Sequence, residues 1–473
     1  MATTAVRPPA SPVQKRMKWN TLQMLRGSLY ISWGLCVVYL IAVIGAAGIH
    51  RDAMTKVCKD SAPSVIAAEH IKFALSDMDA NAANELLFPH GDLPEALEQY
   101  EDRREEAVEA LIEAAENITY GDKEREPIKN LALFMGNYQS EVQRARDLHE
   151  RHDPEYVAAY LKAAKILDEK LLPNADALHK ANEEEMNKAY AGHEGESMAS
   201  MAFVVLIGLG LGAFLICMQL FLLRKTRRIL NPMLLLATVL TLGLLLHTVH
   251  VMSTEREQLR VAKKDAFDSI VALWQTRAVS YAARADQSRY LLEPAKHETR
   301  EADFYTKARL LATMPNQVTQ MQDVAVGQWF EGKYVAFNSG KNRVDGFSGY
   351  LADELGNITF PGEREAALKT LSSFIVFIQM DREIRQKEMA GDHDGAIALC
   401  LGTNPDKPNA NEAFAEFDKY LDKTLEINQK AFDQAVDRGF EDLKGFDLRA
   451  SIVIGLIALL VFGGLFARIG EYR

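Results

Sequence analysis

The hydrophobic and polar residues of this chain are separated into long blocks. Four stretches contain no Asp, Glu, Lys or Arg, namely Gly27–Ile49, Ser197–Leu223, Ile229–Thr254 and Ala450–Ala467. A helix rises about 1.5 Å per residue, so ~18 to 25 apolar residues match a hydrocarbon core of roughly 30 Å. The pattern therefore predicts four membrane-spanning helices and excludes a purely cytoplasmic enzyme.

Two long polar segments lie between the apolar stretches, and each is large enough to bury a core of its own. In the first, apolar residues recur at alternating steps of three and four between residues 128 and 145, which is typical of helices packed in an antiparallel bundle. Turn signals at 89–94, 120–122 and 153–154 divide this segment into four helices. The predicted fold is an all-α membrane protein with four transmembrane helices and two extracytoplasmic four-helix bundles.

Basic residues predict the orientation in the membrane. The segment 1–26 carries five Lys and Arg residues and no acid, and the short connection after the second span is also basic. Both are expected in the cytoplasm by the positive-inside rule. The predicted order is a cytoplasmic basic arm 1–26, span 27–49, bundle 50–196, span 197–223, cytoplasmic loop 224–228, span 229–254, bundle 255–448, span 449–468 and cytoplasmic tail 469–473. A bacterial inner membrane is the expected location.

The two polar segments also share sequence, which predicts an internal duplication. ENITYGDKEREPIKNL begins at Glu116, and GNITFPGEREAALKTL begins at Gly356. His152 with Asp153 in the first segment corresponds to His393 with Asp394 in the second. The sequons at Asn117 and Asn357 fall at matched positions, so we interpret them as structural turn residues rather than glycosylation sites.

Charge and motifs narrow the classes of function. The chain has 54 Lys and Arg against 65 Asp and Glu, and both polar segments are acidic. This argues against nucleic-acid binding, which needs clustered basic residues. There is no Gly-rich phosphate loop, HExxH, CxxC or GxSxG motif. We therefore expect neither an enzyme nor a cofactor.

Polar residues at the start of each bundle are candidates for ligand binding. LSDMDANAANELL places Asp77, Asp79 and Asn81 close together with Asn84 and Glu85. Asp77 with Asn81 and Asn84 could face a ligand amine. In the equivalent helix, Arg277 and Arg284 could hold a carboxylate beside Asp286, since Arg binds carboxylates through a planar fork. The alternative, which we favour, is that these residues form solvated faces or interhelical salt bridges.

Histidines and cysteines near the spans give weaker signals. His247 and His250 lie three residues apart in the third span, and His50 follows the first at a similar depth, so they could meet around a metal. We expect no metal site, because histidines at the end of a span are common hydrogen-bonding groups. Cys58 and Cys400 are expected to be separate thiols, although a disulfide is possible from the sequence.

Two resemblances add to this picture. The arrangement of span, four-helix bundle and span resembles the sensor half of bacterial chemoreceptors and histidine kinases. YVAAYLKAAKILDEKLLPNADALHKAN from Tyr156 and FAEFDKYLDKTLEINQKAFDQAV from Phe414 resemble four-span bacterial membrane proteins best known in actinobacteria. Some of those are encoded beside a glutamate-binding lipoprotein and a soluble serine/threonine protein kinase. The resemblance implies an external solute-binding protein and a cytoplasmic kinase as partners.

The sequence thus predicts a non-enzymatic signal relay. A ligand or a solute-binding protein would shift the first helix of a bundle against the last, and the adjoining spans would carry the movement inward. A structural scaffold or assembly subunit of an envelope complex is the alternative. A channel or transporter subunit is a third interpretation, which the absence of charged residues in the spans disfavours. A homo-oligomer is compatible with all three.

Overall fold

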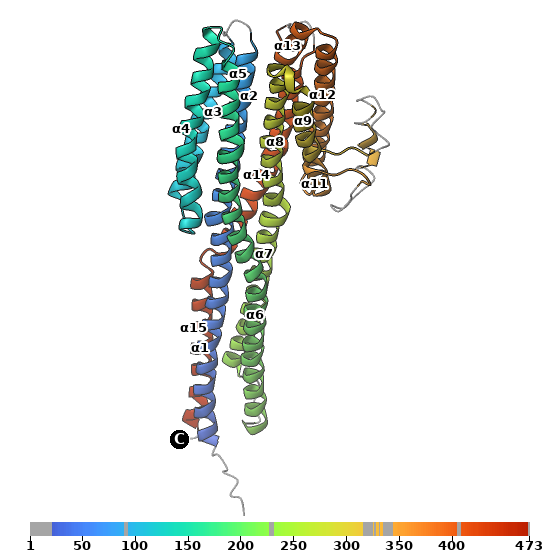
Figure 1. The fold of residues 1–473 in the computed structure, drawn as a ribbon. Helices are drawn as coiled ribbons and strands as arrows, with labels where there is room; N and C mark the ends of the chain where they lie inside the picture. The colour runs from blue at the N-terminus through green and yellow to red at the C-terminus, as the bar shows by residue number, and fades with distance from the viewer. Residues whose placement is uncertain are drawn as a thin grey trace, which may run out of the picture. The chain divides into compact units, whose positions relative to one another are not determined.

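The computed structural model of the chain describes residues 21–88, 93–226, 231–315, 325, 328–330, 332–333, 344–403 and 408–471. These residues form helices joined by short turns, and they contain no β-strand beyond one isolated bridge between Thr313 and Ser348 (Figure 1). Four helical segments are long and apolar enough to cross a membrane. The predicted all-α membrane fold is therefore confirmed. Most of the predicted basic arm and part of the loop 224–228 lie outside the described residues.

The chain divides into two compact units. The apolar unit comprises Met1–Ile49, Glu196–Ser253 and Leu443–Arg473, and the polar unit comprises His50–Gly195 and Thr254–Asp442. In the apolar unit, parts of α1 (Thr21–Met54), α6 (Leu172–Thr226), α7 (Pro232–Arg260) and α15 (Phe446–Glu471) enclose one core of aliphatic residues. Helices approach closely at Gly208, where an added Cβ would lie 3.2 Å from Tyr39 Cε2.

The first half of the polar unit is a bundle of long helices. It contains η1 (Thr55–Ser61), α2 (Ala62–Leu87), α3 (Pro94–Glu116), α4 (Asp122–Glu150), α5 (Tyr156–Ile166), η2 (Leu167–Leu171) and the beginning of α6. α3, α4 and α5 begin after the three turn signals in the sequence. Residues spaced by three and four along α4, including Leu131, Met135, Tyr138 and Val142, are buried in its core. Hydrophobic burial along this seam stabilises the bundle.

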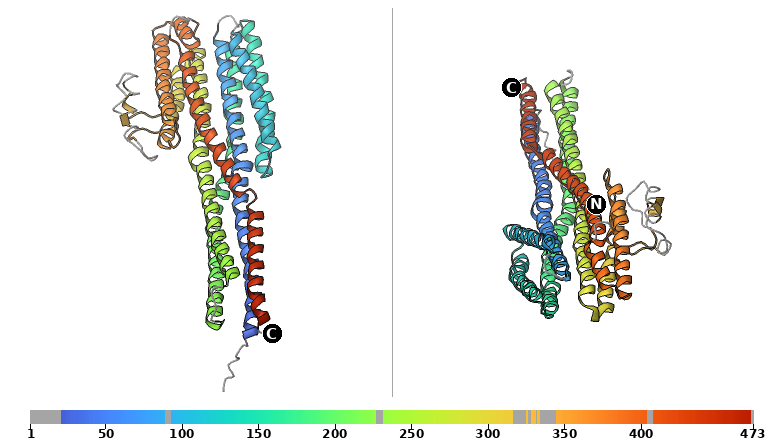
Figure 2. Two further views of the ribbon diagram at one scale, coloured as in Figure 1. Left: turned by 180° about the vertical axis from the view of Figure 1, so that it is seen from behind. Right: turned by 90° about the horizontal axis from the view of Figure 1, so that it is seen from above.

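The second half repeats this order with additional short helices. It contains η3 (Val261–Phe267), α8 (Asp268–Leu292), η4 (Pro294–Lys296), α9 (His297–Leu311), α11 (Tyr350–Gly356), α12 (Glu363–Met389), α13 (His393–Leu401) and α14 (Ala410–Leu443). Aromatic residues fill this core, and Phe374, Phe377 and Phe417 are each at most 1% exposed. α2 and α8 pack against each other between the two halves, and Figure 2 shows them side by side from behind.

The same hydrogen bonds recur at one turn of each half. Asn117 Nδ2 donates to Ser64 Oγ at 2.6 Å and to the Asp60 carbonyl at 3.1 Å. Asn357 Nδ2 donates to Ser269 Oγ at 2.8 Å and to the carbonyl of residue 265 at 3.3 Å. Both asparagines thus tie a turn to the first helix of their half, which supports their interpretation as structural residues.

Three helices widen into π-helical turns. η1 links α1 to α2, η2 links α5 to α6, and η3 links α7 to α8. Each joins its neighbours without a break, so Thr21–Leu87 and Pro232–Leu292 are continuous helical segments. π-turns are rare and occur often at functional sites, because they interrupt the regular hydrogen-bond ladder.

Candidate ligand-binding sites

A buried network of charges joins α2 to α8. Arg289 contacts the carboxylates of Asp79 and Asp286, and its Nε donates to Tyr160 Oη at 3.1 Å. Lys307 forms a further ion pair with Asp286. Asp79 and Asp286 are each 1% exposed and Arg289 is 3% exposed. Two cations therefore balance two carboxylates, as buried charges require.

The larger pocket is a separate polar space between α2, α3, α8 and α14, with a volume of about 760 Å³. Four of the six predicted ligand-binding residues line it: Asp77, Asn81, Arg277 and Arg284. Asn81 Nδ2 donates to Asp77 Oδ1 at 2.8 Å, and Arg103 Nε donates to Asp77 Oδ2 at 2.6 Å. The volume is typical of pockets that bind small molecules.

The two predicted arginines of the larger pocket differ in their partners. Arg277 forms two 2.8 Å hydrogen bonds with the carboxylate of Asp418. Arg284 instead donates to Asn411 Oδ1 at 3.0 Å and lies over the Phe414 ring, 5.2 Å from its centroid. Among the described residues, no carboxylate forms an ion pair with Arg284, and its buried Nε has no hydrogen-bond acceptor. Arg284 is thus the guanidinium of this pocket best suited to bind an anion.

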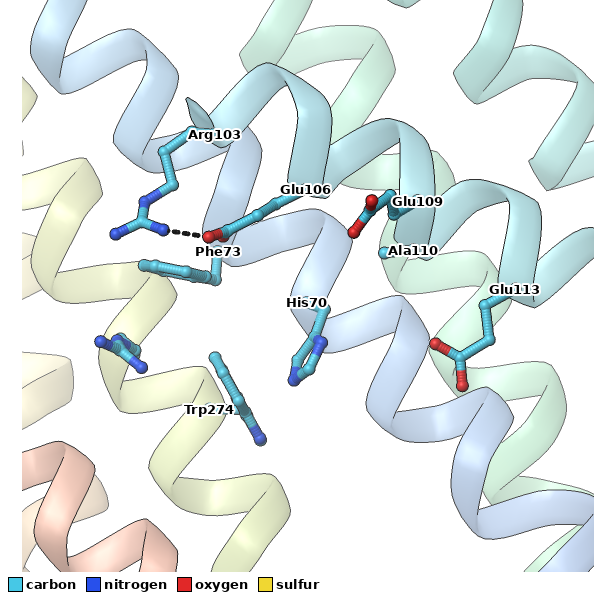
Figure 3. Close-up of a pocket in the computed structure, with 9 residues that line it drawn as sticks. His70, Phe73, Arg103, Glu106, Glu109, Ala110, Glu113 and Trp274 are labelled. Carbon is cyan, nitrogen blue, oxygen red and sulfur yellow. Dashed lines mark hydrogen bonds and ion pairs between the residues drawn. The ribbon is translucent and has the colours of Figure 1, made fainter. Parts of the chain in front are cut away.

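The smaller pocket has a volume of about 470 Å³ and shares Arg103 and Arg277 with the larger one. The two guanidiniums lie 5.0 and 4.6 Å from the centroid of Phe73. Figure 3 shows Phe73, Trp274 and His70 along one side of this pocket, opposite Glu109 and Glu113 of α3. Aromatic faces and carboxylates suit cationic groups, and here Arg103 and Arg277 supply them from within the protein.

A pair of buried glutamates lies in the second half of the polar unit. Glu354 is 3% exposed and Glu363 is fully buried. The backbone N–H groups of Thr359 and Phe360 donate to Glu363 Oε2 at 2.6 and 2.8 Å, whereas Glu354 interacts with the side chains of Glu363, Ser269 and Asn428. Burial and the neighbouring Glu363 carboxylate raise the pKa of Glu354 well above its ordinary value. Glu354 therefore holds a proton far more readily than an exposed glutamate.

A further cluster forms where His50, His193 and Glu255 meet. One potential ligand atom from each residue lies within 4.8 Å of the others, and all three residues belong to the polar unit. The sequence suggests His247 and His250 as neighbours of His50, whereas the residues whose potential ligand atoms converge with His50 in the structure are His193 and Glu255. His247 lies in the apolar unit, with its ring 5.9 Å from that of Phe446.

The structure separates the predicted ligand-binding residues into two groups. Asp77, Asn81, Arg277 and Arg284 line the larger pocket, whereas Asp79 and Asp286 belong to the buried network around Arg289. The sequence pattern did not single out Arg103, Phe73 or Trp274, which complete the pockets. The sequence pattern also did not place Glu255 opposite His50. A signal was present, because Glu255 follows His50 by 205 residues, the same spacing that separates the equivalent serines Ser64 and Ser269 of the two halves.

The cysteines carry no disulfide. Cys36, Cys58 and Cys400 are buried free thiols, and Cys217 is an exposed one. The expectation of separate thiols at Cys58 and Cys400 is confirmed.

Comparison with known proteins gives one match. Residues 53–191 match the family model of the actinobacterial sensor domain, and this range covers most of the first half of the polar unit. The match supports a bacterial sensor-type protein. Neither the curated proteins nor the solved structures yielded a match.

Proposed function

We propose that this protein is a non-enzymatic transmembrane sensor. The polar unit would lie outside the bacterial plasma membrane, with both chain termini in the cytoplasm. It would respond to a small solute, bound directly or presented by a solute-binding protein. The match of residues 53–191 to a sensor domain and the four apolar helical segments support this proposal.

The larger pocket is the proposed binding site, and Arg284 is the observation that carries this assignment. Its guanidinium lines the pocket and forms no ion pair with a carboxylate among the described residues, although it interacts electrostatically with Asp77. Asp77 lies in the same pocket, and the amide of Asn81 supplies further hydrogen-bonding groups. A ligand that carries both a carboxylate and an amine matches these side chains, because each of its charged groups meets one of opposite sign.

The helices that line the pocket offer a route for the signal. α2 and α8 supply pocket residues, and each continues through a π-turn into an apolar helix, α1 or α7. A ligand that draws α2 and α8 together would bias two arrangements of these helices. A cytoplasmic partner such as a serine/threonine protein kinase would read the change. The recurring asparagine turns of the two halves also support an origin by duplication.

Binding can be tested on the full chain in lipid nanodiscs. Each of the twenty common amino acids would be added at millimolar concentration, and the melting temperature of the protein would be recorded. We expect at least one amino acid to raise it, since binding to the folded state alone stabilises that state.

The Arg284→Gln variant should lose this rise. Arg300→Gln is a matched control, since Arg300 lies on α9, pairs with Glu293 and is outside the pocket. The proposed site is wrong if no amino acid stabilises the wild type or if Arg284→Gln responds as strongly as the control.

A further inference from the structure

Three chain segments converge on the cluster of His50, His193 and Glu255. His50 is on α1, His193 on α6 and Glu255 on α7. Their exposed fractions are 0%, 4% and 0%. The cluster is therefore closed to bulk water, and its side chains need partners within the protein.

These partners are incomplete. His193 has no hydrogen-bond partner on either ring nitrogen. One oxygen of Glu255 contacts His50 Nδ1, and the other has no hydrogen-bond partner. The rings of His50 and His193 meet edge to face, with centroids 4.9 Å apart. A buried imidazole with two unpaired nitrogens is rare in a folded protein, because nearly all buried polar groups are hydrogen-bonded.

A divalent cation could bind one ring nitrogen of each histidine and a carboxylate oxygen of Glu255. We propose that His50, His193 and Glu255 form a metal site whose resident ion is Zn²⁺. Neutral imidazole nitrogens and one carboxylate are a common zinc ligand set, with a fourth position open to water or another ligand. Hard cations such as Ca²⁺ and Mg²⁺ prefer oxygen ligands, so two histidines select against them.

The geometry needs only a small adjustment. Zinc holds nitrogen and oxygen ligands at about 2.0–2.2 Å, so tetrahedral ligand atoms lie roughly 3.3 Å apart. The candidate atoms already lie within 4.8 Å of one another. Rotation of the His193 ring, which no hydrogen bond restrains, can supply the contraction. The direct contact between His50 and Glu255 would open to admit the ion.

Of the charged groups around the cluster, one favours the binding of a cation and one opposes it. Asp442 interacts with Glu255 and adds negative charge that favours a cation. Arg256 interacts with His193 and opposes it. The ligands themselves contribute one negative charge, so the ion would keep a net positive charge and attract an anionic fourth ligand.

A bound ion would link three helices, because each ligand lies next to an apolar segment of the chain. His50 directly follows the apolar segment 27–49, His193 precedes the segment 197–223, and Glu255 follows the segment 229–254. A bound ion would therefore fix α1, α6 and α7 to one another where three apolar segments adjoin the polar unit. This inference does not depend on the proposed ligand pocket, because it rests on a different set of residues.

The experiment measures metal content and affinity on the full chain. The protein would be purified in detergent without a histidine tag, its zinc measured by mass spectrometry, and the chelated protein titrated with Zn²⁺ and with Co²⁺ as a visible probe. We expect one zinc per chain and the absorption bands of tetrahedral Co²⁺. His193→Ala and Glu255→Gln should each weaken zinc affinity at least ~10-fold, since loss of even an outer-shell partner has that effect.

His179→Ala is the matched control, because His179 is a buried histidine on the same helix that contacts Glu69 instead. It should retain zinc. If a variant fails to fold, the Co²⁺ spectrum of the wild type and the effect of EDTA on its melting temperature decide the question. The proposal is overturned if the chelated wild type takes up neither metal, or if His193→Ala binds zinc as tightly as His179→Ala.

Discussion

The ion pair between Asp79 and Arg289 joins the two halves of the polar unit, and its removal should destabilise the fold strongly. Arg289→Met would leave the Asp79 carboxylate, which is 1% exposed, with the Tyr160 hydroxyl as its hydrogen-bond donor at 3.3 Å. Asp286 would keep Lys307. Breaking a buried pair by removing one partner costs about 3–5 kcal/mol. At about 2–4 °C per kcal/mol, the melting temperature should fall by on the order of 10 °C.

A double-mutant cycle tests the cause of this loss. Asp79→Asn removes the charge that Arg289→Met leaves unpaired, so the double variant should be more stable than the sum of the two single losses predicts. Coupling between contacting residues of this kind amounts to about 0.5–3 kcal/mol. Melting would be followed by circular dichroism in detergent, with Lys369→Met as a control at an exposed ion pair. Strict additivity of the two single losses would refute the reasoning.

Three further predictions concern single residues and use the same melting assay. The pKa of Glu354 is raised in the folded protein, so its contribution to stability is complete below the pKa of 4.5 in the unfolded chain and is lost as the pH rises through the folded pKa. The melting temperature of Glu354→Gln should therefore fall less towards alkaline pH than that of the wild type; equal pH profiles would contradict this. Asn117→Ala should lower the free energy of unfolding by about 1–3 kcal/mol through two lost hydrogen bonds. Thr119→Ala, which also removes the sequon but loses one exposed hydrogen bond of 3.2 Å, should lower it less; equal losses would argue against the structural role of Asn117. Phe73→Ala should lower the free energy of unfolding by about 3–5 kcal/mol because the ring is 4% exposed. Leu133→Ala, at a side chain that is 60% exposed, should change it little; similar effects at both positions would count against close packing around Phe73.

The sequence pattern predicted the helical fold because its signals are local. Charge-free stretches of sufficient length define the spans, and prolines and glycines mark the turns that precede α3, α4 and α5. Each signal acts within a few residues of the feature it predicts. The π-turns η1, η2 and η3 left no such signal, since one extra residue per turn barely changes the apolar spacing.

Pairings between distant residues could not be predicted in the same way. Asp79 and Arg289 lie 210 residues apart, and nothing in their own helices distinguishes them from Asp77 and Arg284, which line the larger pocket instead. The rotation of α2 against α8 decides which polar side chain enters the network and which faces the pocket. Only packing of the whole unit fixes that rotation.

In the proposed relay, a ligand bound between α2 and α8 alters the helices that lead to the spans. Its most direct test is amide hydrogen exchange on the full chain in nanodiscs, with and without the amino acid that stabilises it most. We expect slower exchange in the pocket residues of α2 and α8, and a change of exchange in η1 and η3, which connect these helices to α1 and α7. Protection confined to the pocket, with η1 and η3 unchanged, would contradict a relay along these helices.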